Sequence, residues 1–267
     1  MIRVAAVTPE IRVGDLERNL ATLREALADA EAAGARLIVA PELATSGYVL
    51  RDHDEARSVS LTREDPRVAG VGGGLGPGVV AVFGYLERAG ERLHNAAAVV
   101  TRDGLLASYR KTHLWGDEPD LFDPGDAPAP VLDTPIGRLG LAICYDNEFP
   151  EVPRGVALAG AEVLALPVNW PLVPRPAGEH PPETIMAMAA ARASGMAVVI
   201  ADRHGSERGV EWTGGTAVIS AEGWIVAEPG GSGIALADVA KMTLDAKAIG
   251  PRNDLFKDRR TDLYTDR

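Results

Sequence analysis

The sequence predicts an α/β protein in which helices cover a mixed β-sheet. Apolar runs rich in β-branched residues alternate with helical patterns at residues 2–42, 137–170 and 182–202. Two further stretches, 79–115 and 215–228, contain paired apolar runs separated by turn residues. Alternating strands and helices produce parallel pairing, whereas hairpins add antiparallel strands, so the two patterns together indicate a mixed sheet.

The first unit, residues 2–42, is predicted as strand, helix and strand. "IRVAAV" is a β-rich run, and the apolar residues that follow it recur at helical spacing: Leu16, Leu20, Leu23, Leu27 and Ala30. Asp15 is placed to cap this helix and Gly34 to end it. "RLIVAPE" then forms a short strand, so the unit is a β-α-β crossover that buries its sheet.

Residues 55–115 combine an irregular segment with two strands. The part from 55 to 78 is charged and then Gly-rich ("VGGGLGPG"), without the strand-then-helix setting of a nucleotide-binding loop, and we expect a surface loop there. "VVAVFGYLE" and "HNAAAVVTRDGLLASYRKTHLW" follow as neighbouring antiparallel strands, with a turn at "RDG".

The second half repeats the alternation. "GRLGLAIC" is a strand, Pro150 opens a helical stretch to Ala159, and "EVLALPVNW" is the next strand. Residues 182–194 suit a helix, "MAVVIAD" a strand, and "GTAVISAEGWIVAE" a hairpin. Because no linker divides the chain, we expect residues 1–267 to form a single domain, with a polar tail at 250–267 that needs a docking surface.

The composition excludes several classes of protein. The chain has 267 residues and is 46% hydrophobic, which is enough to bury a substantial core. Its net charge of -11 argues against a nucleic-acid partner. One cysteine, no signal-peptide pattern and no apolar run of about 18 residues predict a cytoplasmic protein without membrane contact. No metal-ligand motif is present, so we expect neither metal nor cofactor.

Three residues of complementary chemistry stand at or near predicted strand ends. Cys144 ends "GLAIC", Glu42 follows "LIVAP", and Lys111 shares a strand face with apolar neighbours. A lone cysteine is more often a buried structural residue, and a lone acid or lysine more often a surface ion pair. Together they would supply a nucleophile, a proton acceptor and an oxyanion donor, because a thiol needs activation at neutral pH.

Three blocks of the sequence resemble the signature blocks of the nitrilase superfamily of carbon–nitrogen hydrolases. They are "APELATSGY", "SYRKTHLW" and "GLAICYDNEFPEV", in this order. The resemblance also takes in "GDEPDLFDPGD", "LALPVNW", "AARASGMAVVIADR" and "GGTAVISAEGWIV", so it covers nearly the whole chain.

The resemblance implies a four-layer α-β-β-α sandwich. It places Glu42 as the base, Lys111 as the oxyanion lysine and Cys144 as the nucleophile, and we expect the backbone N–H of Tyr145 to assist Lys111. Further site residues that it implies are Glu118, with Asp117 and Asp120 as close rivals, and three pocket aromatics: Tyr48, Trp115 and Trp170. The two tryptophans could instead be ordinary core residues. It also implies a homodimer or higher homo-oligomer, with the tail at 250–267 as a candidate contact between subunits.

One departure narrows the expected activity. Many members read C-Y-D-x-R-F-P-E after the nucleophile, whereas this chain has Glu148 in place of the arginine. That form resembles amidases acting on primary amides, including 5-aminopentanamidase-like and amino-amide types. We therefore expect an amidase that hydrolyses a small aliphatic or amino-acid-type amide through a cysteine thioester. A nitrilase or an N-carbamoyl amidohydrolase of the same fold is the alternative.

The residues alone leave three other functions open. A cysteine–histidine hydrolase would use His113 or another of the five histidines, the others being His53, His94, His180 and His204. A serine–lysine hydrolase matches "SYRK", although a strand would send Ser108 and Lys111 to opposite faces. A non-catalytic binding module is the third.

Overall fold

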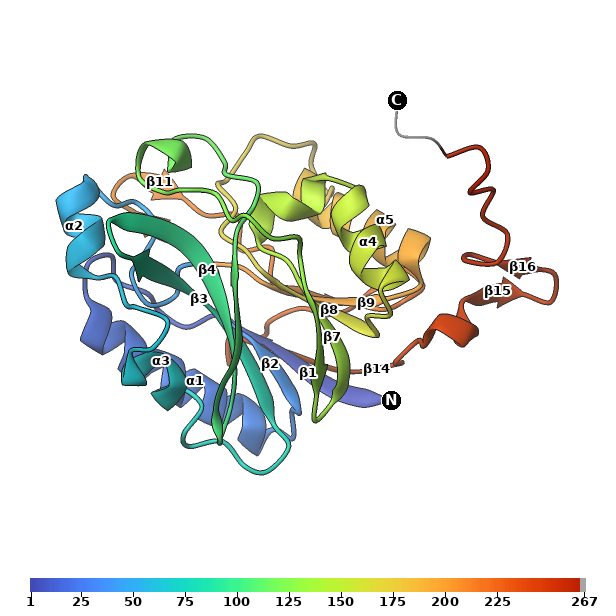
Figure 1. Cartoon of the computed structure of the whole chain (residues 1–267), viewed down its shortest axis with the longest axis horizontal. Helices are drawn as coiled ribbons and strands as arrows, with labels where there is room; N and C mark the ends of the chain where they lie inside the picture. The colour runs from blue at the N-terminus through green and yellow to red at the C-terminus, as the bar shows by residue number, and fades with distance from the viewer. Residues whose placement is uncertain (265–267) are drawn as a thin grey trace.

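The computed structural model describes residues 1–264 as two six-stranded sheets packed face to face, with helices on both outer faces (Figure 1). This is a four-layer α-β-β-α arrangement. The predicted α/β sandwich is therefore confirmed, and it consists of two sheets rather than one mixed sheet.

The first sheet has the strand order β14-β1-β2-β3-β4-β5. β1 pairs in parallel with β2 and β2 with β3, whereas the remaining pairs are antiparallel. Its strands are β1 (Ile2–Val7), β2 (Leu37–Val39), β3 (Val80–Ala89), β4 (Arg92–Thr101), β5 (Gly104–Arg110) and β14 (Ile234–Val239). The edge strand β14 was not predicted from the sequence.

The second sheet has the order β13-β12-β9-β8-β7-β6, with parallel pairing in β7-β8-β9. Its strands are β6 (Val131–Thr134), β7 (Gly137–Leu141), β8 (Val163–Pro167), β9 (Ala197–Ala201), β12 (Ala217–Ile219) and β13 (Ile225–Ala227). The predicted hairpin at 215–228 is confirmed as β12 and β13.

Alternation along the strands explains why the molecule has four layers. In β1, Val4 and Ala6 join the core between the sheets, whereas Ala5 and Val7 pack with the leucines of α1. The strands β1, β2, β3 and β4 are thus apolar on both faces, because one face meets the other sheet and the opposite face meets helices.

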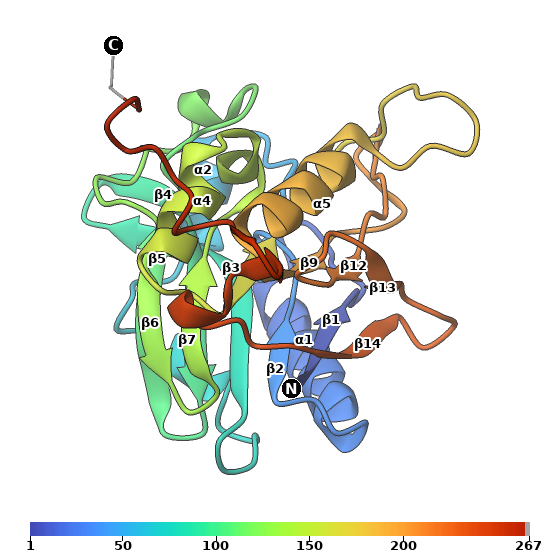
Figure 2. The same cartoon turned by 90° about the vertical axis from the view of Figure 1, so that its right-hand side faces the viewer.

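Helices cover the two outer faces. α1 (Leu16–Ala32) begins at Asp15, whose side chain accepts the N–H of Arg18, and the chain turns after it at Gly34, with φ +93°. α4 (Glu151–Leu158) and α5 (Pro182–Ser194) lie on the second sheet, away from α1 (Figure 2).

The prediction of a loop at 55–78 was wrong in part. The segment contains α2 (His53–Ser58) and α3 (Pro66–Gly70), capped by Asp52 and Asp65. Four apolar residues of this segment are buried in the protein: Leu61, Val68, Val71 and Leu75. Short helices with few apolar residues leave too little periodicity to be recognised.

Shorter elements complete the described chain. They are the 3-10 turns η1 (Glu118–Asp120), η2 (Cys144–Glu148) and η3 (Leu244–Ala246), and the small ribbons β10 (Ser206–Glu207) with β11 (Val210–Glu211) and β15 (Ala248–Gly250) with β16 (Asn253–Asp254). Within residues 1–264 no helix combines the length and the apolar character needed to cross a bilayer.

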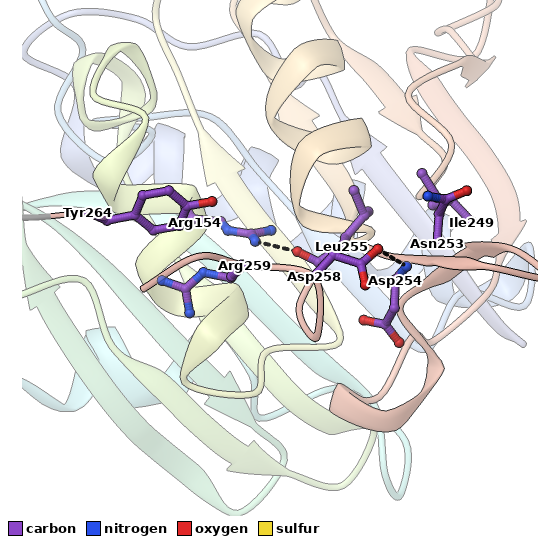
Figure 3. A pocket seen from close by; sticks show the side chains of 8 residues that line it. All are labelled: Arg154, Ile249, Asn253, Asp254, Leu255, Asp258, Arg259 and Tyr264. Carbon is purple, nitrogen blue, oxygen red and sulfur yellow. Dashed lines mark hydrogen bonds between the residues drawn. The ribbon is translucent and has the colours of Figure 1, made fainter. Parts of the chain in front are cut away.

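The C-terminal tail packs beside α4 and lines, together with Arg154, an open pocket of about 550 Å³ (Figure 3). Phe256 lies against the guanidinium of Arg154, 4.4 Å from ring centroid to Cζ, and the Leu255 carbonyl accepts a hydrogen bond from Arg154. The predicted contact of residues 250–267 with another subunit stays a prediction, and residues 265–267 lie outside the described part of the chain.

Gly84 of β3 allows the segment after β2 that carries Glu42 to pass close to the backbone of β3. A Cβ atom on Gly84 would lie 2.2 Å from the backbone N of Leu43 and 2.5 Å from Cα of Glu42. Only a residue without a side chain fits there, because backbone atoms cannot swing aside.

We expect Gly84→Ala to lower the free energy of unfolding by about 1 to 3 kcal/mol and to displace Glu42. Gly155→Ala is the matched control, because a Cβ at Gly155 meets nothing within 4 Å and alanine favours its helix. Urea unfolding of both variants measures this effect. Equal stability of Gly84→Ala and the parent would contradict the close approach.

Candidate active site

A buried lysine that follows β5 lies between two carboxylates, one from the segment after β2 and one from η1. Nζ of Lys111 donates to Oε1 of Glu42 at 2.8 Å and to both carboxylate oxygens of Glu118 at 2.9 Å. Lys111 and Glu42 are fully buried, and Glu118 is 4% exposed. The cluster therefore holds one cation and two acids in a dry site, where Coulomb interactions are strong.

Asn95 of β4 is a site residue that the sequence analysis missed. Its Nδ2 donates to Glu42 at 2.7 Å and to Glu118 at 2.9 Å. The only available signal was a polar residue inside the apolar run "HNAAAVV". Asn95 fixes the spacing of the two carboxylates, because one amide group bonds to both.

Cys144 stands three residues after β7, at the start of η2, with a φ of +47°. A positive φ is costly for a residue other than glycine and is often found at functional sites. Burial raises the pKa of the thiol and the charge of Glu42 raises it further, while Lys111 lowers it. The thiol is therefore held protonated beside a carboxylate and an ammonium.

Asp146 fixes the turn that carries Cys144. Its carboxylate accepts the backbone N–H of Ile143 at 3.0 Å and the phenol O–H of Tyr109 at 2.9 Å. His113 contacts the same carboxylate through Nδ1 at 2.7 Å and stacks on Phe149 at 3.9 Å between ring centroids. His113 therefore serves this buried network, which weakens the cysteine–histidine alternative.

The pKa of Glu42 is raised to about 7, chiefly by burial, while the charge of Lys111 opposes the shift and that of Glu118 adds to it. Oε1 of Glu42 is occupied by Lys111 and Asn95, whereas Oε2 has no hydrogen-bond partner among residues 1–264. This free oxygen is the group of the cluster suited to accept a proton.

A cavity of about 110 Å³ opens at Cys144, between η2, the end of β8 and the start of α5. It is lined by Trp115, Cys144, Tyr145, Glu148, Asn169, Trp170, Pro171 and Glu183. A second cavity of about 270 Å³ shares Trp115 and Pro171 with it and is lined by Tyr48 and Glu118 as well. All three predicted pocket aromatics thus line one cavity or the other.

Asp202 and Gly215 contact Trp170 and fix its position in the cavity wall. The buried carboxylate of Asp202 accepts the N–H groups of Trp170, Arg203 and Gly215 at 2.7 to 3.0 Å. Burial raises the pKa of Asp202 to about 7, against these hydrogen bonds. A Cβ at Gly215 would lie 2.9 Å from Cε3 of Trp170, so glycine leaves room for the indole ring.

Tyr48 is held by Glu207, whose Oε1 accepts the N–H groups of Tyr48 and Val49, both at 2.8 Å. Arg203 pairs with Glu207 and lies 5.5 Å from the Trp212 ring centroid, and Trp212 meets Tyr48 edge to face at 5.7 Å. The wall of the larger cavity is thereby fixed by a buried ion pair.

The other sequence candidates lie apart from this cluster. Ser108 bonds with Tyr85 and Glu87, not with Lys111, which removes the geometric basis of a serine–lysine site. His94 contacts the carbonyl of Asp123 through Nδ1 at 2.8 Å. The remaining rivals are exposed: Asp117, Asp120, His53, His180 and His204.

A family model described as carbon-nitrogen hydrolase matches residues 3–248. The chain belongs to the carbon-nitrogen hydrolase family. This confirms the predicted membership in the nitrilase superfamily, and the chain is an amidohydrolase acting on carbon–nitrogen bonds other than peptide bonds.

Relatives of this carbon-nitrogen hydrolase have several activities. A nitrilase from Pyrococcus abyssi is 32% identical over 99% of both chains. An N-carbamoylputrescine amidase from Arabidopsis thaliana is 30% identical over 94% of this chain and 90% of its own length. A structure of an amidase from Nesterenkonia AN1 matches with a TM-score of 0.80 at 28% identity, covering 98% of this chain and 95% of the amidase.

The raised pKa of Glu42 predicts a pH-dependent effect of Glu42→Gln on stability. Between pH 4.5 and about 7, the folded parent keeps a proton that the unfolded chain has lost, so its free energy of unfolding falls as pH rises. The variant cannot titrate there, so its stability relative to the parent should increase across this window by up to about 3 kcal/mol.

Urea unfolding of both proteins across that pH range measures the difference. Asp202 also titrates near this range, and the charge of Glu42 contributes to its raised pKa, so Glu42→Gln in an Asp202→Asn background isolates the effect of Glu42. A difference that stays constant between pH 4.5 and about 7 would contradict the raised pKa.

Proposed function

We propose that this carbon-nitrogen hydrolase is an amidase, which converts a small primary amide into a carboxylic acid and ammonia. The observation that carries this proposal is the buried Lys111, bonded to Glu42 and Glu118 next to the only cysteine of the chain. A base with a free oxygen, a fixed cation and a thiol are the groups that acyl transfer through a thioester requires.

In the first half-reaction, Oε2 of Glu42 accepts the thiol proton as Sγ of Cys144 attacks the amide carbon. The pKa of Glu42, raised to about 7, suits this role, because a base near the working pH is both ionised and strong enough. The protonated Glu42 then gives its proton to the departing nitrogen. Ammonia leaves, and a thioester joins the acyl carbon to Sγ.

The tetrahedral intermediate places a negative charge on the former carbonyl oxygen. We assign its stabilisation to the ammonium of Lys111 and to the backbone N–H of Tyr145, in the first turn of η2, where N–H groups lack intrahelical partners. Glu118 and Asn95 position the cation and the base for this step.

In the second half-reaction, Glu42 takes a proton from water, which attacks the thioester carbon. The carbon–sulfur bond breaks, the acid is released, and Cys144 regains its proton. One carboxyl group thus serves both halves.

Amides should be the best substrates in a panel of aliphatic amides, amino-acid amides, nitriles and carbamoyl compounds. Glu148 lies in the cavity at Cys144, and its charge does not suit the anionic carbamoyl substrates that an arginine there would bind. Ammonia release measures each rate. The proposal would be refuted if amides were inert and either nitriles or carbamoyl compounds were hydrolysed fastest. The first result would indicate a nitrilase and the second an N-carbamoyl amidohydrolase.

Lys111→Ala should lower kcat by about 10²- to 10³-fold, the loss typical of one oxyanion donor, and should also lower the melting temperature, because two buried carboxylates lose their cation. Added methylammonium should restore part of the activity by occupying the vacated place of the ammonium. Steady-state kinetics and thermal melting measure the two effects, with the exposed Lys257→Ala as control. A kcat within a few-fold of the parent would show that Lys111 has no such role.

A further inference from the structure

Two carboxylates from different elements face the small cavity at Cys144. Glu148 is the last residue of η2, and Glu183 is in the first turn of α5; both line the cavity. Burial raises the pKa of Glu148, and the negative charge of Glu183 raises it further, so the two groups interact.

Neither carboxylate has a cationic partner within residues 1–264. Glu148 and Glu183 form no salt bridge there, and Oε2 of Glu183 is shielded from solvent without a hydrogen-bond partner. Other buried acids of the described chain have such partners: Glu87 pairs with Arg110, and the buried Asp202 accepts three backbone N–H groups. Two acids held together without a cation destabilise the empty site, and a bound cation would relieve this repulsion.

Asn169 provides an independent sign of a polar ligand in this cavity. It is 1% exposed, it lines the cavity, and neither its Nδ2 nor its Oδ1 has a hydrogen-bond partner in the described chain. Buried amides are normally paired, because an unmade hydrogen bond costs about 1 to 3 kcal/mol. The backbone of the same residue lies close enough to Cys144 to lower the pKa of the thiol, and both residues line the same cavity, so Asn169 is a neighbour of the reacting atom.

We propose that Glu148 and Glu183 form a subsite for an ammonium group on the acyl part of the substrate, with the Asn169 amide bonding to the same ligand. The enzyme would then select short aminoalkyl amides over neutral or acidic ones. This inference rests on the proposed amidase function and adds the charge of the substrate to it. The cavity of about 110 Å³ limits the acyl chain to a few carbons.

The aromatic lining is consistent with this ligand. Trp115 meets Tyr145 edge to face at 4.9 Å between ring centroids, so one wall of the cavity is aromatic while the two acids supply its charge. Aromatic faces attract ammonium groups, and carboxylates bind them through charge-assisted hydrogen bonds.

Three amides of matched size test the proposal: 4-aminobutanamide as the cation, pentanamide as its neutral isostere, and succinamic acid as the anion. We expect the cation to be hydrolysed with a kcat/KM about 10-fold or more above the value for pentanamide, and succinamic acid to be the poorest substrate. In Glu148→Gln and in Glu183→Gln, the ratio of cation to neutral isostere should fall by about 10-fold. The exposed Glu151→Gln is the control and should keep the parent's ratio.

Binding to the Cys144→Ala variant separates this proposal from the amidase function, because it needs no turnover. In calorimetry, the aminoalkyl amide should bind more tightly than pentanamide, and adding Glu148→Gln should abolish the difference. Hydrolysis of all three amides at similar rates, with equal binding, would overturn the ammonium subsite and leave the amidase proposal intact. Preferential binding of the cation without hydrolysis of any amide would overturn the amidase function and keep the subsite.

Discussion

The site depends on one ammonium held between two carboxylates in the dry interior of the sandwich. Lys111 has no solvent contact, and both of its acidic partners are buried with it. Three charges of this kind would be unfavourable if one partner were missing, so the cluster requires every element that supplies it to be in place. Burial of the carboxyl is the main reason why the pKa of Glu42 lies well above its ordinary value, and the second negative charge, on Glu118, raises it further against the opposing charge of Lys111.

The fold provides this arrangement because the ends of strands from both sheets meet at one edge. Glu42 follows β2 and Lys111 follows β5 in one sheet, while Cys144 follows β7 in the other. Two residues at this junction have a φ of +47°: Leu43, next to Glu42, and Cys144 itself. Local strain at such positions persists only where the surrounding structure determines it, here through Gly84 beneath Leu43 and Asp146 beneath Cys144.

The sequence was sufficient to predict the site residues that are reactive or charged and lie beside apolar strands. A carboxyl, an amine and a thiol near the ends of apolar strands pointed to one edge of a sheet, and the motifs around them indicated the family. Their partners could not be predicted in this way. Asn95, Asp146 and Asp202 look like ordinary polar residues until the strands pair, since their hydrogen bonds join segments far apart in the chain. The edge strand β14 was missed because it is only partly buried, and α2 and α3 because they are too short to show a period.

The central claim is that Glu42 controls the reactivity of Cys144, and alkylation by chloroacetamide measures this directly, because the chain has a single cysteine. The account predicts that the alkylation rate rises with pH through about 7, the pKa of Glu42, and that Glu42→Gln lowers it by orders of magnitude at neutral pH. A rate that follows an ordinary thiol pKa of about 8.5 and is unchanged in Glu42→Gln would contradict it.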